Sequence, residues 1–261
     1  MALVDRDDRA AGVVVLTFND PDRRNAMTEA MGDAIAAAFA DLDGDQDVRA
    51  VVLTGAPPAF SAGGDLDMLQ ELGRRARDED FDASPFMREF YERFLSVRRC
   101  PVPVIAAING HAVGAGLCVA LACDLRIVAN EAKVGLNFAR LGLHPGMGGS
   151  WLLPRAVGVQ RGAEMLYTGR LVSGADFARW GAALEAVPAD EVLAAALELA
   201  GQIAASSPEV VRQLRVSLAA SPTSSLEDQL AAEADAQAVN YASPQFTEGL
   251  AAVRERRSAQ F

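Results

Sequence analysis

Apolar residues follow two kinds of pattern along the first two thirds of the chain. Short and nearly continuous apolar runs, typical of strands covered on both faces, occupy residues 12–20, 48–56, 101–110 and 123–130. The stretch between the first two runs, residues 28–42, is amphipathic instead and begins at Thr28, which suits an N-cap. Strands and helices that alternate at such short intervals predict an α/β fold with right-handed crossovers.

The segments between the later runs differ in character. Residues 57–72 begin as a loop and enter a helix, whereas residues 73–86 are charged and irregular and predict a mobile loop. Residues 86–100 are amphipathic. Residues 115–122 form a wholly apolar helix that starts from a loop of small residues.

No further strand is predicted after about Ala189. The remaining chain divides into helical segments at residues 190–206, 208–220, 225–243 and 244–256. We therefore expect a core over residues 1–189 that holds the functional site, followed by a helical region over residues 190–261. The alanine-rich faces of this region suit packing on the core or on a neighbouring subunit.

Composition narrows the class of protein. The 261 residues are 51% hydrophobic and 23% charged, which is enough to build one large core. The net charge of −11 argues against nucleic acid as a partner, because phosphates need a basic surface. The charged start of the sequence lacks the apolar core of a signal peptide, and no apolar run reaches the roughly 20 residues of a membrane span. We expect a cytoplasmic protein without membrane insertion.

The cysteines indicate neither disulfides nor a metal site. Cys100, Cys118 and Cys123 are odd in number and lack the spacing of metal ligands. Small buried thiols in a reducing compartment are favoured over a redox or metal role. The sequence also has no His, Cys and carboxylate cluster, so no metal is expected.

Two glycine-rich loops carry the candidate chemistry. "FSAGGDL" (residues 60–66) and "GHAVGAGL" (residues 110–117) each follow a buried region and lead into a helix. The N–H groups of Gly64 and Ala115 are expected to stand unpaired at these helix starts, where the dipole favours negative charge. Two such donors aimed at one oxygen form an oxyanion hole, which stabilises an enolate that develops from a thioester carbonyl. Each loop alone could also be explained by a glycine that packs at a tight corner between a strand and a helix. The two loops together are more specific evidence for an oxyanion hole.

Six segments in a fixed order extend this interpretation over essentially the whole chain. They are "NDPDRRNAMTEAM", "AFSAGGDLDML", "PVPVIAAINGHAVGAGLCVALACDLRIVA", "GLHPGMGGSWLLPRAVG", "LYTGRLVSGADFARWG" and "SPQFTEGLAAVRERR". In these motifs the sequence resembles the crotonase superfamily, also called the enoyl-CoA hydratase/isomerase family. The resemblance implies a spiral of repeated ββα units and a C-terminal helical region used in trimerisation. A homotrimer or a dimer of trimers is therefore expected, with an acyl-CoA thioester as ligand. Coenzyme A would be part of the substrate, and no separate cofactor is implied.

The resemblance also assigns roles to individual residues. It places the oxyanion hole at Gly64 and Ala115, with coenzyme A and the acyl group contacted by Arg23, Arg24, Ala26, Ala62, Gly63, Asp65, Leu66, Gly114, Phe138 and Leu141. The two arginines could instead belong to a solvated turn. Arg24 is the favoured phosphate ligand, since a guanidinium matches phosphate geometry.

The sequence departs from the family pattern where hydratases carry acids. Cys118 and Phe138 stand at the positions of two catalytic glutamates, and Gly146 stands where some isomerases use an aspartate. A buried cysteine is mostly protonated near neutral pH, and Phe138 would line an apolar acyl pocket. Hydration is therefore less expected than isomerisation, decarboxylation or another lyase step. The alternative is a protein that binds acyl-CoA without catalysis.

Other polar residues could still move a proton. His144 lies six residues after Phe138 and could act as an acid or base, or it could be a loop histidine that bonds backbone. His111 is taken as structural, and Asp65 is expected to cap the helix that follows it. Solvent-exposed positions are the favoured interpretation for Asp67, Glu71 and Asn137.

Overall fold

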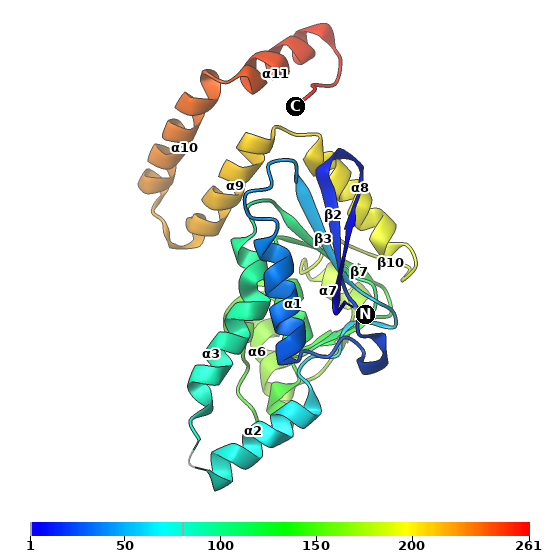
Figure 1. Cartoon of the computed structure of the whole chain (residues 1–261). Coiled ribbons are helices and arrows are strands. Elements are labelled where there is room, and N and C mark those ends of the chain that lie inside the picture. Colours follow the sequence, from blue (N-terminus) through cyan, green and yellow to red (C-terminus); the bar gives the residue numbers. More distant parts are fainter. Residues whose placement is uncertain (1, 80) are drawn as a thin grey trace.

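The strands of the protein form two sheets (Figure 1). The computed structural model describes residues 2–79 and 81–261. The larger, six-stranded sheet has the order β1 (Val4–Asp8), β2 (Val13–Phe18), β3 (Ala50–Gly55), β5 (Val104–Ile108), β7 (Leu125–Ala129) and β10 (Glu185–Val187). The smaller, four-stranded sheet has the order β4 (Ala59–Ser61), β6 (His111–Val113), β8 (Lys133–Gly135) and β9 (Val172–Ser173). Neighbouring strands are parallel except for β1 with β2 and β8 with β9.

From β3 to β8, successive strands alternate between the two sheets and so produce a spiral. β3 and β4 are followed by α2 (Leu66–Asp78) and α3 (Ala83–Phe94), and β5 and β6 are followed by α4 (Ala115–Ala122). β7 and β8 lead through a short 3-10 turn to α5 (Gly149–Val157) and α6 (Val159–Thr168). Each unit gives one strand to each sheet and then a helix. The expected α/β spiral of ββα units with a C-terminal helical region is confirmed.

The remaining helices cover the sheets or extend from them. They are α1 (Glu29–Ala40), α7 (Gly174–Arg179), α8 (Val192–Ala204), α9 (Pro208–Ala220), α10 (Leu226–Tyr241) and α11 (Pro244–Glu255). α8 packs on strands of the larger sheet and buries one alanine-rich face there. α10 and α11 lie beyond the sheets, at the top of Figure 1. The division of the chain at residue 189 stays a prediction, since α8 packs with the core.

Several local predictions agree with the structure. The four apolar runs form β2, β3, β5 and β7, and the strands end with β10. Thr28 caps α1, because its hydroxyl accepts a hydrogen bond from the Met31 N–H at 3.1 Å. Asp65 caps α2 in the same way, accepting from the Met68 N–H at 2.9 Å.

The mobile loop predicted over residues 73–86 is wrong. α2 continues to Asp78, and α3 begins at Ala83 after Asp82, whose side chain accepts a hydrogen bond from the Ser84 N–H. Arg74 bonds the carboxylates of both Glu71 and Glu79. Charges that made the sequence look irregular therefore pair with one another along an exposed helix.

The short strands were not predicted from the sequence. β4, β6, β8, β9 and β10 have only two or three residues each, too few to show an alternating pattern. β1 was missed for a different reason. It is a mostly exposed edge strand whose charged residues suggest a loop, and such charges are a common way to protect a sheet edge.

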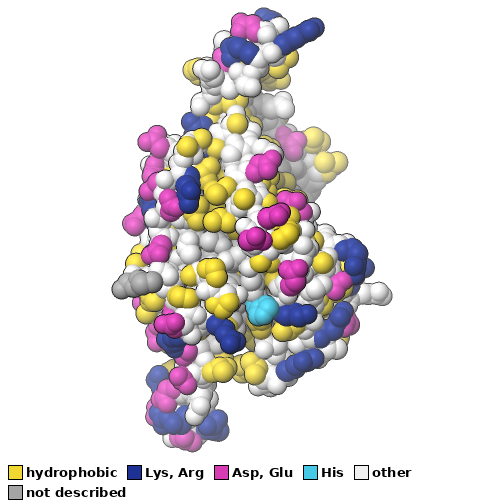
Figure 2. Space-filling model, turned by 90° about the vertical axis from the view of Figure 1, so that its right-hand side faces the viewer, with side chains coloured by type: hydrophobic (Ala, Val, Ile, Leu, Met, Phe, Trp, Pro, Cys, Tyr) yellow, Lys and Arg dark blue, Asp and Glu magenta, His cyan; other side chains and the backbone are white. Residues whose placement is uncertain are grey.

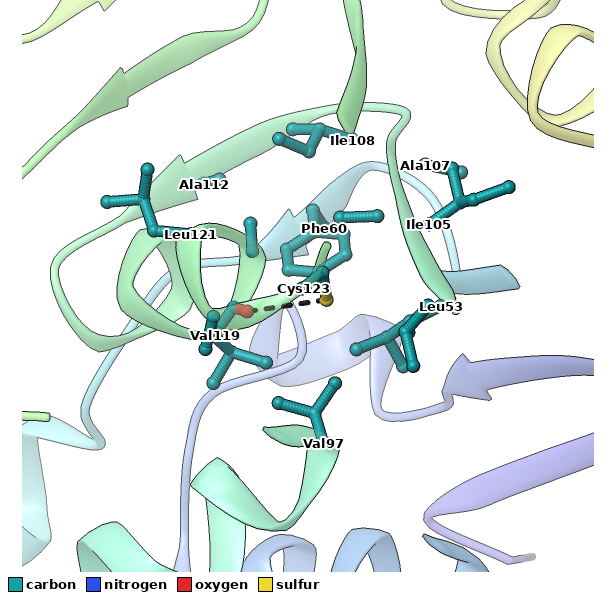
Figure 3. Packing of buried hydrophobic residues seen from close by; sticks show 14 of the residues in the cluster. Leu53, Phe60, Val97, Ile105, Ala107, Ile108, Ala112, Val119, Leu121 and Cys123 are labelled. Carbon is teal, nitrogen blue, oxygen red and sulfur yellow. Dashed lines mark hydrogen bonds between the residues drawn. The ribbon is translucent and has the colours of Figure 1, made fainter. Parts of the chain in front are cut away.

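The core lies where the two sheets and α4 meet. Figure 3 shows Phe60 of β4 surrounded by Leu53 and Ile105 of the larger sheet and by Val119 and Leu121 of α4. The Phe60 ring also packs edge-on against Phe18 at 5.7 Å between centroids. All residues of α4 are buried, so this helix has no polar face. Its start is thereby held rigidly against β4.

The surface carries apolar side chains among the charged ones (Figure 2). Several of the most exposed belong to the C-terminal helices, namely Leu214, Val216, Leu218, Leu226, Leu230, Val239, Tyr241, Phe246, Leu250 and Val253. Among the described residues, no helix has both the length and the apolar character needed to cross a membrane.

The contact between α4 and β4 gives a test of the fold. A Cβ on Gly116 would lie 2.6 Å from the Ser61 carbonyl oxygen, whereas a Cβ on Gly201 in α8 would meet nothing within 4 Å. Gly116→Ala is expected to destabilise the protein by about 1–3 kcal/mol, because backbone atoms must move. Gly201→Ala should stabilise it by up to about 1 kcal/mol through helix propensity. Urea unfolding midpoints measure both, and equal shifts for the two variants would contradict the packing described here.

Candidate active site

Parallel pairing of β4 with β6 brings the two glycine-rich loops together. Ala59 pairs with His111 and Ser61 pairs with Ala112, so both strands end at the same edge of the smaller sheet. A Cβ on Gly63 would lie 2.5 Å from the Val113 carbonyl oxygen, which shows that the loops touch. Gly63 also has a positive φ of 93°, a conformation that favours glycine.

The N–H groups of Gly64 and Ala115 are free in this arrangement. Met27 bonds the residues on either side of Gly64, donating to the Gly63 carbonyl and accepting from the Asp65 N–H. Ala115 is the first residue of α4, after Gly114 at φ 55°. Neither amide has a hydrogen-bond acceptor within residues 2–79 and 81–261. Gly64 precedes the N-cap Asp65, so its N–H stands one residue earlier than the helix start expected from sequence.

Gly64 and Ala115 both line a cavity of about 890 Å³. Of the residues singled out from sequence, the cavity brings together Arg23, Ala26, Ala62, Gly63, Gly64, Asp65, Leu66, Gly114, Ala115, Phe138, Leu141, His144 and Gly146. Asp67 and Asn137 line it too, although both were interpreted as solvated positions. The walls come from the two glycine loops, from α2 and α3, and from the segment after β8.

Arg24 and Cys118 are the predicted residues that the described cavity lining does not include. Arg24 is exposed and adopts a left-handed conformation at φ 53°. Its neighbour Arg23 lines the cavity and forms an ion pair with Asp65. Of the two arginines, Arg23 is therefore the one beside the site. Glu71 lies outside the lining and is paired with Arg74 at 2.6 Å.

Cys118 lies behind the cavity wall. Its side chain is fully buried, and its Sγ donates to the Gly146 carbonyl at 3.5 Å. Burial raises the pKa of the Cys118 thiol to about 12, so the thiol keeps its proton at neutral pH. Phe138 and Gly146 both line the cavity and supply no acid. A carboxylate is thus missing at all three family positions.

His144 lines the cavity from an exposed loop. Its Nδ1 lies 2.9 Å from the Pro145 carbonyl oxygen. Because a carbonyl only accepts, Nδ1 carries the hydrogen in this contact, and Nε2 of the neutral ring is left as a possible proton acceptor. The contact matches the backbone-bonding role considered from sequence and is also compatible with the acid or base role.

Tyr91 of α3 is a cavity residue that the sequence analysis did not single out. A Cβ on Gly146 would lie 2.5 Å from the Tyr91 hydroxyl oxygen, so that hydroxyl occupies the space beside the glycine. Burial raises the pKa of Tyr91, and the neighbouring Cys118 acts in the same direction. The sequence did offer a signal for Tyr91. Residues 86–100 are amphipathic, and a tyrosine among them joins an apolar ring to a polar hydroxyl, which suits the wall of a cavity.

No metal-binding group is found in the part of the chain that the structure describes: no three His, Cys, Asp or Glu residues are placed to hold an ion. The polar groups of the cavity are therefore individual side chains and backbone amides. Among them are the amides of Gly64 and Ala115, on the two glycine loops that touch at Gly63 and Val113.

Known proteins of similar sequence and structure share this fold along the whole chain. The family model described as enoyl-CoA hydratase/isomerase matches residues 8–261. A probable enoyl-CoA hydratase of Mycobacterium tuberculosis is 44% identical over 250 residues, covering 94% of each chain. The 1,2-epoxyphenylacetyl-CoA isomerase of Escherichia coli is 33% identical, covering 96% of this chain and 95% of its own.

The structural comparison agrees. A crystal structure of an enoyl-CoA hydratase from Bacillus anthracis superposes with a TM-score of 0.89 at 31% identity, covering 99% of this chain and 98% of that one. A family model that matches nearly the whole chain and relatives above 30% identity show the family. The chain therefore belongs to the enoyl-CoA hydratase/isomerase family of the crotonase superfamily, whose enzymes act on acyl-CoA thioesters.

Proposed function

We propose that the protein binds an acyl-CoA thioester in the 890 Å³ cavity and stabilises its enolate with the N–H groups of Gly64 and Ala115. The observation that carries this proposal is the pair of unpartnered amides where the two glycine loops meet. A thioester oxygen gains negative charge as an enolate forms, and two fixed donors stabilise that charge. Coenzyme A arrives as part of the substrate, and we propose no further cofactor.

The coenzyme A portion is proposed to follow the outer part of the cavity. Arg23 supplies a guanidinium there for a phosphate, and Ala26, Ala62 and Gly63 leave room for the pantetheine chain beside backbone groups. Leu66 and Leu141 are 70% and 50% exposed, so they offer apolar contact at the rim. Arg24 directly follows Arg23 and is proposed as a second phosphate ligand, although it is outside the cavity lining.

The reaction is proposed to be an isomerisation, a decarboxylation or another lyase step rather than hydration. Hydration needs one group to activate water and another to deliver a proton. Cys118 is buried and protonated, while Phe138 and Gly146 have no titratable group. A decarboxylation needs the oxyanion hole but no strong base. His144 is the candidate acid or base among the lining residues.

A second candidate function is binding of acyl-CoA without catalysis. The full burial of Cys118 behind the wall favours it, because no carboxylate then stands at position 118, where the resemblance implies a catalytic glutamate. The relatives, a probable enoyl-CoA hydratase and a 1,2-epoxyphenylacetyl-CoA isomerase, favour the catalytic function instead. Calorimetry with saturated acyl-CoAs and a turnover panel distinguish the two.

We also propose a cytoplasmic homotrimer or dimer of trimers. The apolar side chains exposed on α9, α10 and α11 support an oligomer, since monomers rarely expose so many large apolar residues together. Light scattering on the purified protein is expected to give three or six times the chain mass, and a stable monomer at micromolar concentration contradicts this proposal.

Crotonyl-CoA hydration tests the role of the missing acids. Positioned acids and bases each contribute about 10²–10⁴-fold in rate, so we expect hydration at least about 10²-fold below an ordinary kcat of about 10 s⁻¹. Loss of the enoyl absorbance with time is the measurement. Hydration at an ordinary rate would show that another residue replaces the acids. In that event, loss of hydration in His144→Ala would show that the His144 imidazole is that residue.

Removal of one amide hydrogen tests the oxyanion hole. Ala115→Pro deletes the N–H at the first position of α4, where proline is tolerated, while Ala115→Gly keeps it and serves as the control. The wild-type protein should bind a butyryl-CoA thioester roughly ten-fold more tightly than its thioether analogue, which lacks the carbonyl. We expect the proline variant to lose most of this preference and the glycine variant to retain it. An unchanged preference in the proline variant excludes the Ala115 N–H as a donor.

A further inference from the structure

One face of α3 brings a single polar atom into the cavity. Met87, Phe90 and Tyr91 line it from that face, and only Tyr91 carries an oxygen. Phe90 is buried, and its ring stacks with Phe86 and is tilted against Phe94. Tyr91 therefore follows a packed aromatic residue on α3.

The Tyr91 hydroxyl lies near the proposed position of the acyl chain. Cys118 follows Ala115 by three residues, which is about 4.5 Å along α4. The Cys118 Sγ bonds the Gly146 carbonyl at 3.5 Å, and Gly146 faces the Tyr91 hydroxyl. Ala115, Gly146 and Tyr91 line the same cavity, so an acyl chain that extends from a carbonyl at Ala115 toward Gly146 would pass the hydroxyl.

This hydroxyl has no partner within residues 2–79 and 81–261. Burial and the neighbouring Cys118 raise the pKa of Tyr91, so the group is a neutral hydrogen-bond donor at physiological pH. A hydrocarbon chain packed over it would remove its water and leave the donor unsatisfied. Sites built around a buried donor discriminate against ligands that lack the matching acceptor.

We propose that Tyr91 is a specificity-determining residue whose hydroxyl selects acyl-CoA thioesters with an acceptor oxygen on the acyl chain over those with a plain hydrocarbon chain. This inference rests on the proposed acyl-CoA function and names a substrate class for the same cavity. Gly146 makes the arrangement possible, because any side chain there would displace the hydroxyl.

Binding of two matched ligand pairs tests the proposal. Butyryl-CoA and 3-oxobutyryl-CoA differ by one keto oxygen, and valeryl-CoA and glutaryl-CoA differ by a terminal carboxylate. Calorimetry gives the preference for the oxygenated member in the wild-type protein, in Tyr91→Phe and in the control Tyr167→Phe, whose side chain is exposed. Comparison of the same pair between variants cancels any effect of the oxygen on the thioester itself.

We expect Tyr91→Phe to reduce the preference for the oxygenated member of at least one pair by roughly ten-fold. Tyr167→Phe should leave it unchanged. Gly146→Ala should reduce it as Tyr91→Phe does, because the new Cβ would lie 2.5 Å from the hydroxyl oxygen in its present position.

The outcomes separate the two proposals. If wild-type protein binds all four thioesters and Tyr91→Phe leaves both preferences unchanged, the role of Tyr91 is wrong and the acyl-CoA function stands. If no thioester binds to the wild-type protein, the acyl-CoA function is overturned, and the role of Tyr91 is overturned with it.

Discussion

The parallel pairing of β4 with β6 is the interaction on which the candidate site depends. Each strand has three residues, yet together they set two loops side by side that are about fifty residues apart in the sequence. The loops touch so closely that Gly63 has no room for a side chain beside Val113. The buried helix α4 then fixes the Ala115 amide against this contact. The small sheet thereby brings to one cavity Gly64 and Ala115, whose amides lack an acceptor among the described residues.

None of the three positions at which the family resemblance implies an acid carries a carboxylate, although Asp65 and Asp67 line the cavity. Burial keeps the Cys118 thiol protonated and behind the wall, and Phe138 makes its part of the cavity apolar. In the proposed function, the Gly64 and Ala115 amides stabilise negative charge on a thioester oxygen. We propose a reaction that generates an enolate by losing a group because such a reaction needs fewer proton transfers than the addition of water.

Sequence reasoning was most successful where a long apolar pattern or a specific motif was present. The four apolar strands β2, β3, β5 and β7 of the larger sheet, the cap at Thr28 and the two glycine loops could all be predicted because each has a local signature. The strands of the smaller sheet could not, since two or three residues carry no period. The sequence also could not show which of Arg23 and Arg24 lies at the cavity. The turn at these residues places Arg23 in the cavity lining and leaves Arg24 outside it, and two neighbouring arginines look alike in the sequence.

The contact between Gly146 and Tyr91 makes the two positions interdependent. A Cβ at position 146 would lie 2.5 Å from the tyrosine oxygen, so an aspartate introduced there would have to displace the hydroxyl. The cavity wall at this point can therefore present the Tyr91 hydroxyl in its present position or a side chain at position 146, but not both. Any redesign that adds an acid at position 146 has to include position 91.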